Sequence, residues 1–255
     1  MNYPNLEALI KTIEILRSED GCAWDREQTH KSLRHNMIEE AYEAIDAINT
    51  DDMNHLKEEL GDVLLQVLLH SQIAKEEGCF NIDDVAKRLN EKLIHRHPHV
   101  FGDIKTEDTK VILDNWDKLK AEEKPHRKSV MDGVSKSQSA LMSAQKISCK
   151  AVKVGFEWEN DAQLRQCILS EFREFMQAKT YDNREEEFGD ILFALVNLAR
   201  RSQIDAEQAL IRSNTKFMKR FRKMEEITQK PLKELSFEEW DTLWKKAKEL
   251  TKEEK

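Results

Sequence analysis

The sequence predicts an all-α fold, built from two tandem copies of one helical-bundle unit. Three observations favour it. The 255 residues include only seven glycines and four prolines, so the chain has little of the turn punctuation that strand-rich folds need. Apolar residues recur at helical spacing in several segments. Similar blocks of sequence also return about 128 positions later, and no segment reads as a pair of strands.

Helical spacing is clearest in residues 185–203, where apolar side chains fall at i, i+3, i+4 and i+7 along one face. The same stripe follows residue 60, and residues 37–48 place apolar side chains on one face as well. Gly78 predicts the end of a helix that begins near Asp52, and the next helix should run from about residue 81 to just before Pro98. The second copy predicts helices near 161–179, 183–203, 205–228 and 236–250.

The repeat joins blocks that keep their order along the chain. EELGDVLLQVLL (58–69) matches EEFGDILFALVN (186–197), and EEAYEAIDA (39–47) matches SEFREFMQA (170–178). The remaining matched blocks are 21–25 with 155–159, 91–96 with 215–220, and 116–120 with 244–248. Domain-sized copies indicate tandem duplication rather than a solenoid. The predicted boundaries are 1–122 for the first unit, 123–138 for a linker and 139–255 for the second unit.

Bulk properties exclude several classes of protein. The net charge of −8 and a pI of about 5.6 disfavour a binder of nucleic acid polymers, which is usually basic. The N-terminus does not resemble a signal peptide, and the longest apolar stretch, residues 63–69, is too short to span a membrane. Four scattered cysteines without CxxC spacing indicate reduced thiols, so we expect a cytoplasmic protein.

Acidic residues form pairs three positions apart, which places both members on one side of a helix. The residue four positions after each acid is apolar in nearly every case, so the acids align with the inward face. Two antiparallel helices joined by a short loop would bring two such pairs together, and only a cation between them would relieve the repulsion. The pairs are Glu40/Glu43 and Glu59/Asp62 in the first copy, and Glu171/Glu174 and Glu187/Asp190 in the second.

The expected cation is Mg²⁺, with Mn²⁺ as an alternative, because the ligand set is carboxylates without imidazole. Gly61 and Gly189 precede the last acid of each copy and cost helix stability of about 1 kcal/mol relative to alanine. Each glycine either permits close approach of a ligand or helix, or is merely tolerated.

Basic and aromatic residues repeat in register with the acids. A Lys/Arg pair four positions apart can bind phosphate oxygens, and a tryptophan offers a plane on which a base can stack. These residues are Lys92, Arg96, Trp116 and Lys120 in the first copy, and Lys216, Arg220, Trp244 and Lys248 in the second.

The combined pattern resembles the MazG nucleoside triphosphate pyrophosphohydrolases. The resemblance is carried by GCAWDREQT (21–29), RHPHVFGD (96–103) and EELGDVLLQV in the first copy, and by GFEW, EEEFGDILFALVNLAR and NTKFMKRFR in the second. It covers nearly the whole chain. It implies MazG-type helical bundles, a homodimer, Mg²⁺ dependence, and hydrolysis of (d)NTPs to the monophosphate and pyrophosphate, with a broad base range and a house-cleaning role in the nucleotide pool.

The resemblance also assigns roles to residues. It favours the second copy as the catalytic one, in which the carboxylates hold metal and Lys216 and Arg220 neutralise the departing pyrophosphate. One departure from the motif is Ser170, where the first copy has Glu39. The general base is either a ligand carboxylate or a neighbour such as Glu186. The metal ligands are Glu171, Glu174, Glu187 and Asp190; the nucleotide ligands are Lys216, Arg220, Trp244 and Lys248; the second set is Glu39, Glu40, Glu43, Glu59, Asp62, Lys92, Arg96, Trp116 and Lys120.

Two other functions fit the same residues. One is a relative of narrower specificity, such as a dUTPase-like or phosphoribosyl-ATP pyrophosphohydrolase-like enzyme, which would act on a single substrate. The other is a non-enzymatic metal-binding helical adaptor, in which Glu187→Gln would change no nucleotide turnover.

Overall fold

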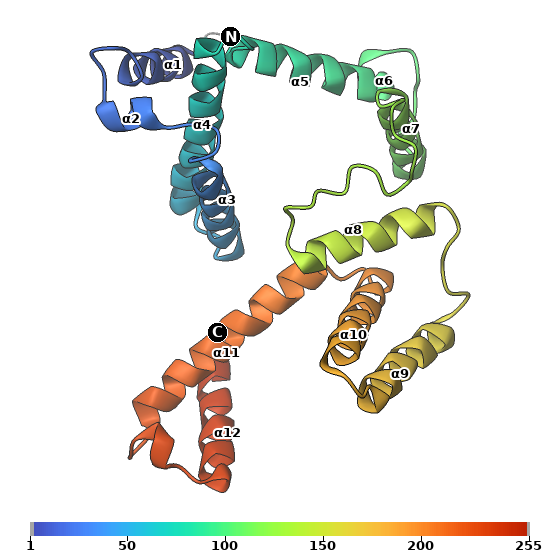
Figure 1. Ribbon diagram of the computed structural model, residues 1–255. Helices are drawn as coiled ribbons and strands as arrows, with labels where there is room; N and C mark the ends of the chain where they lie inside the picture. The colour runs from blue at the N-terminus through green and yellow to red at the C-terminus, as the bar shows by residue number, and fades with distance from the viewer. Residues whose placement is uncertain (1–2, 254–255) are drawn as a thin grey trace. The chain divides into compact units, whose positions relative to one another are not determined.

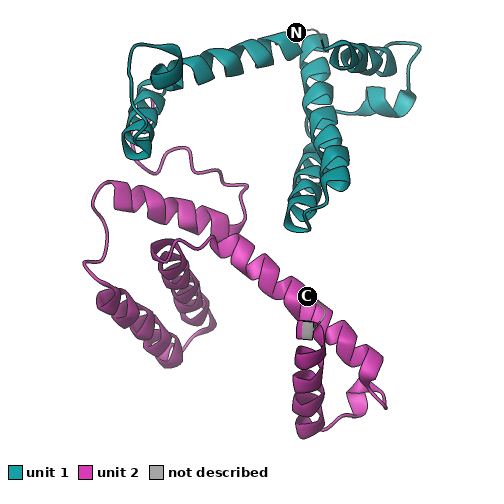
Figure 2. Cartoon of the chain, turned by 180° about the vertical axis from the view of Figure 1, so that it is seen from behind, with its two compact units in different colours: residues 1–125 teal, residues 126–255 magenta. Residues whose placement is uncertain are grey.

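The computed structural model describes residues 3–253 of the chain. Within this range all regular structure is helical and no strand is present, which confirms the all-α prediction (Figure 1). The chain divides into two compact units, Met1–Pro125 and His126–Lys255 (Figure 2). This division falls inside the segment 123–138 that the sequence marks as a linker.

Each unit contains a long helical hairpin and a later helix pair. Unit 1 contains α1 (Pro4–Leu16), α2 (Ala23–Glu27), α3 (Arg34–Asn49), α4 (Met53–Glu76), α5 (Ile82–Arg96), α6 (Pro98–Phe101) and α7 (Thr109–Glu122). Unit 2 contains α8 (Ala140–Lys153), α9 (Asp161–Gln177), α10 (Tyr181–Arg201), α11 (Ala206–Ile227), the 3-10 helix η1 (Leu232–Glu234) and α12 (Phe237–Glu253).

The hairpin of unit 1 is formed by α3 and α4, which pack along each other. The Asp52 side chain begins α4 by accepting hydrogen bonds from the backbone amides of Asn54 and His55, both at 3.0 Å. Such N-caps stabilise a helix by about 1 kcal/mol because they satisfy amides that lack intrahelical partners. The tight connection through Thr50–Asp52 therefore makes α3 and α4 antiparallel neighbours.

The core of unit 1 lies between α1 and α4. Its buried residues are Ile13, Leu33, Leu68, Leu69 and Ile73. Burying each such side chain contributes roughly 1.5–3 kcal/mol. Arg17, just after α1, reaches across to Glu76 at the end of α4 with a guanidinium–carboxylate distance of 2.7 Å. The core and this ion pair hold α1 at the end of α4 that lies away from the α3–α4 loop (Figure 1).

The last part of unit 1 is the helix pair α5 and α7, joined through the short α6. A capping box begins α5: the Asn81 side chain accepts from the amides of Asp83 and Asp84, while the Asp84 carboxylate accepts from the Asn81 amide at 3.0 Å. Pro98 follows α5 at once and opens α6. Because proline cannot continue a helix, the chain turns here and α7 returns against α5.

Unit 2 repeats this plan. Thr180 caps α10 through its hydroxyl, which accepts from the Asn183 amide at 3.2 Å, and α9 and α10 form the hairpin. Leu164, Ile168 and Ala194 are buried between them, and α8 packs against α10. Farther along the chain, α12 packs against the part of α11 that lies away from α10 (Figure 1).

The chain buries less of its surface than is usual for a protein of this size. The accessible surface is 19077 Å². Two separate compact units of half this mass would together expose about 14,000 Å². Apolar side chains contribute to the excess, among them Phe172, Met176 and Phe188 on the hairpin of unit 2, which are 46%, 78% and 51% exposed. Unit 1 has comparable side chains, such as Ile48 at 56% and Leu60 at 55%, so in the described part of both units apolar side chains lack cover from their own unit.

Two smaller predictions concern the cysteines and the membrane. All four cysteines are free thiols, as the sequence predicts. No helix in the described part of the chain has the length and apolar character needed to cross a bilayer.

Candidate functional site

The α3–α4 hairpin brings three of the predicted carboxylates together. Oxygens of Glu40 and Glu43, from α3, and of Glu59, from α4, lie within 4.8 Å of one another. We call these residues the first acidic cluster. The i, i+3 spacing places Glu40 and Glu43 on the face of α3 that meets α4, and the short loop sets Glu59 opposite them. Asp62 lies outside the three-residue set, but its charge still acts on Glu40.

The electrostatics of the first acidic cluster are those of crowded anions. Burial, and then the charges of Asp62 and Glu43, raise the pKa of Glu40. Burial and the neighbouring Glu59 raise the pKa of Glu43. Oε2 of Glu59 is buried and has no hydrogen-bond partner among the described residues. An orphaned carboxylate oxygen surrounded by other carboxylates is the environment that a divalent cation stabilises.

His55 is a neighbour of this cluster that sequence reasoning missed. Its Nε2 lies 2.9 Å from Oε1 of Glu59, one helical turn earlier on α4. The candidate ligands of unit 1 are still carboxylates alone, and His55 adds an imidazole beside one of them. The i, i+4 spacing of His55 and Glu59 could have indicated this contact, and the matching position of the second copy is Asn183.

The α9–α10 hairpin forms a second acidic cluster, made of Glu171 from α9 and Glu187 and Asp190 from α10. Their oxygens also lie within 4.8 Å of one another. Burial raises the pKa of Glu187, and the charges of Glu174, Asp190 and Glu171 raise it further. Burial and Glu171 raise the pKa of the nearby Cys167 thiol, whose sulfur lies 3.6 Å from a Glu171 oxygen. The two units thus present similar sets of hard oxygen ligands.

Glu174 lies just outside the second acidic cluster. Its Oε1 accepts a hydrogen bond of 2.9 Å from the hydroxyl of Ser170. In the first unit the position of Ser170 belongs to Glu39, which is exposed and lies near His35, at 3.9 Å. The departure from the motif therefore replaces a leading acid by a hydroxyl that orients Glu174 along α9.

Both units also contain an arginine on a tryptophan ring. The guanidinium of Arg96 lies 5.2 Å from the ring centre of Trp116, and that of Arg220 lies 5.8 Å from the ring centre of Trp244. We call each of these an Arg–Trp pair. Cation–π attraction holds the guanidinium over the ring and leaves its edge to donate hydrogen bonds. The predicted lysines, Lys92, Lys120, Lys216 and Lys248, are all exposed.

The Arg–Trp pairs and the acidic clusters are on different helices of each unit. Trp244 lines an aromatic pocket of about 280 Å³ between α11 and α12, with Phe217, Phe221 and Trp240. No member of the second acidic cluster lines that pocket. In unit 2 the pocket that Trp244 lines is therefore separate from the second acidic cluster.

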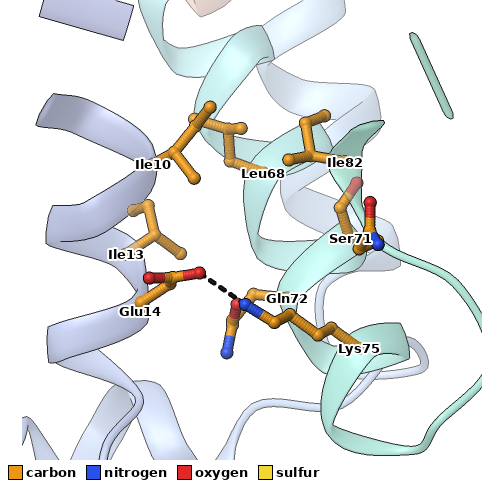
Figure 3. A pocket seen from close by; sticks show the side chains of 9 residues that line it. Ile10, Ile13, Glu14, Leu68, Ser71, Gln72, Lys75 and Ile82 are labelled. Atoms are coloured by element: carbon orange, nitrogen blue, oxygen red, sulfur yellow. Dashed lines mark hydrogen bonds and ion pairs between the residues drawn. The ribbon is translucent and has the colours of Figure 1, made fainter. Parts of the chain in front are cut away.

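Another pocket lies apart from this chemistry. Figure 3 shows the side chains of Ile10, Leu68 and Ile82 around a space of about 140 Å³, with the Glu14–Lys75 ion pair at its edge. Its α4 residues start at Leu68, so the pocket begins roughly 14 Å along the helix from Glu59 at 1.5 Å per residue. Its lining is mainly apolar, and it contains none of the predicted site residues.

Comparisons with known proteins agree with the geometry. The family model described as the MazG nucleotide pyrophosphohydrolase domain matches residues 28–101, which lie in unit 1 and include the first acidic cluster. The chain is 47% identical to the nucleoside triphosphate pyrophosphohydrolase/pyrophosphatase MazG of Thermotoga maritima, over 95% of each protein. It is 40% identical to a nucleoside triphosphate pyrophosphohydrolase of Escherichia coli (strain K12), over 87% of this chain and 88% of that protein. It is also 46% identical to the uncharacterized protein YabN of Bacillus subtilis, over 97% of this chain and 52% of that protein.

Proposed function

Because the chain belongs to the MazG family of nucleotide pyrophosphohydrolases, we propose that it hydrolyses (d)NTPs to (d)NMP and pyrophosphate. The observation that carries the proposal is the convergence of three carboxylates in each hairpin, with ligand oxygens within 4.8 Å. Tandem duplication of the unit is part of the proposal. It is supported by the same order of hairpin and Arg–Trp pair in both units.

Mg²⁺ is the proposed cofactor, because the two clusters offer carboxylate oxygens, the donors that Mg²⁺ prefers. The orphaned Oε2 of Glu59 fits this role. When bound, the cation neutralises triphosphate charge and lowers the pKa of water. Glu171, Glu187 and Asp190 would hold it in unit 2, with Glu174 beside them.

The reaction joins a water oxygen to the α-phosphorus and breaks the bond from that phosphorus to the bridging oxygen. The water proton passes to a carboxylate, either of the cluster or of a neighbour such as Glu186. The departing pyrophosphate gains negative charge. Lys216 and Arg220 stabilise that charge, Arg220 through hydrogen bonds from its planar guanidinium. Lys248 adds positive charge near the phosphates.

Trp244 supplies the base site in this proposal. Stacking on an aromatic ring suits every base because each has a π face. Such a site fits the broad base range that we propose, and a house-cleaning role in the nucleotide pool is part of the same proposal. Four free thiols favour the reducing cytoplasm as the compartment.

A homodimer completes the proposal. The accessible surface exceeds that of two compact units by about 5,000 Å², which is the scale of an obligate interface. The separation of the Arg–Trp pair from the acidic cluster in each unit also favours a second copy, which would bring these parts together.

The test is Mg²⁺-dependent pyrophosphate release from a panel of NTPs and dNTPs, with product identification, by wild type, Glu59→Gln and Glu187→Gln. We expect several substrates to be cleaved, and Glu187→Gln to reduce kcat at least 100-fold. Glu59→Gln separates the contribution of unit 1. Activity on one substrate alone would favour the narrow relative, and absence of turnover in wild type would overturn the proposal.

A further inference from the structure

The two Arg–Trp pairs differ in what faces the guanidinium. In unit 1, Nε of Arg96 donates to Oε1 of Glu123 at 2.9 Å, and Nη2 donates to the other oxygen. Nδ1 of His95 lies 3.4 Å from the same Oε1. The Glu123 carboxylate therefore accepts from Nε and Nη2 of Arg96, the pair of donors with which a guanidinium can also bind a phosphate.

The Arg96–Glu123 contact is sheltered and fully charged. The side chains of Arg96 and Glu123 are 8% and 24% exposed. Hydrogen bonding to Arg96 lowers the pKa of Glu123 to about 2, and the same contact raises the pKa of Arg96. Glu123 is therefore an anion at every physiological pH, fixed on the arginine that the sequence assigns to phosphate.

Among the described residues of unit 2, no carboxylate takes the place of Glu123. The residue seven positions after the tryptophan is Glu123 in unit 1 and Thr251 in unit 2. The Thr251 hydroxyl donates to the Ala247 carbonyl of its own helix, at 2.8 Å. Among the described residues no carboxylate pairs with Arg220, and its Nε is buried without a hydrogen-bond partner. A buried guanidinium N–H without an acceptor is costly. Arg220 as a whole is half-buried, so its outer guanidinium donors are the ones that a phosphate oxygen can take.

We propose that Glu123 is an internal anion that occupies the phosphate-binding arginine of unit 1, whereas Thr251 leaves Arg220 of unit 2 open to a polyphosphate. One residue thus decides which of the two units accepts the triphosphate. The choice of a polyphosphate as the ligand rests on the proposed function. That Glu123 occupies Arg96 rests only on the contacts between these two side chains.

The test is a reciprocal exchange in the full-length chain, with inorganic tripolyphosphate as the probe. Binding is measured by calorimetry in EDTA, so that only direct side-chain contacts are detected. Arg220→Ala removes the contribution of unit 2. The double variant Arg220→Ala/Glu123→Thr should bind tripolyphosphate saturably. Its Kd for tripolyphosphate should be at least tenfold lower than that of Arg220→Ala alone. Further substitution of Arg96→Ala should abolish the gain.

The reciprocal variant is Thr251→Glu in the otherwise unchanged chain. It should weaken tripolyphosphate binding at least tenfold. Two matched controls should change neither result: Glu122→Thr removes the adjacent acid of unit 1, and Thr242→Glu adds a charge to the exposed side of α12.

Removal of Glu123 leaves Arg96 without its partner, so each variant is checked for cooperative unfolding by circular dichroism. Glu123→Gln keeps a neutral hydrogen-bond acceptor and should show a smaller gain. If folded Glu123→Thr and Glu123→Gln gain no binding, the proposal is overturned. If neither variant folds, Thr251→Glu decides it: a tenfold loss supports the proposal and an unchanged Kd overturns it. None of these readouts needs turnover, so they are separable from the test of the proposed function.

Discussion

At the scale of single residues, the acidic clusters place like charges close together. Two charges 4 Å apart repel by about 4 kcal/mol at an effective dielectric of 20 and by about 1 kcal/mol in water. The raised pKa of Glu187 shows that its surroundings disfavour the ionised form, first through burial and then through Glu174, Asp190 and Glu171. Without a cation, repulsion among these carboxylates destabilises the folded state. A bound cation would remove that repulsion, because the same carboxylates would be its ligands.

This balance gives a residue-scale prediction for Glu187→Gln. In EDTA the free energy of unfolding of Glu187→Gln should exceed that of wild type. The increase should be roughly 0.2–0.5 kcal/mol for each charge repulsion that the substitution removes. With Mg²⁺ at one hundred times its Kd, the free energy of unfolding of wild type should rise by about 2.7 kcal/mol, and that of the variant should rise much less. Thermal unfolding followed by circular dichroism, with and without Mg²⁺, measures both effects.

The control for this prediction is Glu185→Gln, which removes an exposed acid from the same helix outside the cluster. It should respond to Mg²⁺ like wild type. Equal Mg²⁺ stabilisation of Glu187→Gln and wild type would contradict the assignment of Glu187 as a ligand.

At the scale of elements, the hairpin is the unit that makes the site. Each hairpin has a glycine immediately before its last acid, Gly61 on α4 and Gly189 on α10. Apart from the backbone of its own helix and its chain neighbours, a Cβ added at either glycine would meet no described atom within 4 Å. By contrast, a Cβ at Gly21 would collide with the backbone carbonyls of Ile15 and Leu16, so only glycine fits that turn. Packing within its own unit therefore does not account for Gly61 or Gly189.

An element-scale prediction follows for Gly189→Ala. Alanine should stabilise α10 by up to about 1 kcal/mol in denaturant unfolding, because the helix interior tolerates its side chain. If the open space receives a ligand or a second copy, the same variant should lose NTP turnover or dimerisation despite its greater stability. Full activity in a stabilised Gly189→Ala would show that this glycine is merely tolerated. Gly61→Ala is the matched variant of unit 1.

At the scale of the whole molecule, the exposed apolar faces are the dominant feature. The excess of accessible surface over two compact units would, if apolar, represent a large unrealised hydrophobic free energy at about 25 cal/mol per Å². Met176, Tyr181 and Phe188 of the α9–α10 hairpin are 78%, 77% and 51% exposed. Patches of this kind mark interaction surfaces in folded proteins.

The prediction at this scale is that Met176→Glu disrupts the proposed homodimer. A charge placed in a closed apolar interface would remain unpaired, so we expect monomer to appear in sedimentation velocity at concentrations where wild type is dimeric. Gln177→Glu is the control, since it adds the same charge to an exposed polar position of the same helix. A monomeric wild type, or a dimeric Met176→Glu, would contradict the prediction.

The predictability of the helices depended on how strongly each segment was patterned. The sequence predicts helices at 161–179 and 183–203, and the structure has Asp161–Gln177 and Tyr181–Arg201. It made no prediction for α1, although Leu6, Leu9, Ile10 and Ile13 have helical spacing. The helix α8 was also missed, and its N-terminus is marked by a Ser139 side-chain cap. Both helices carry local signals, so the sequence is sufficient to predict them without tertiary information.

The sequence by itself determined which carboxylates share a helix face, because i, i+3 spacing is a local property of the backbone. It also determined which blocks recur, and hence which arginine and tryptophan of each unit correspond. Only the tertiary structure decided that Glu123 lies on Arg96, 27 positions earlier, and that the Arg–Trp pairs and acidic clusters occupy different helices of a unit. Such contacts depend on how the chain turns between α5 and α7, which local spacing does not encode.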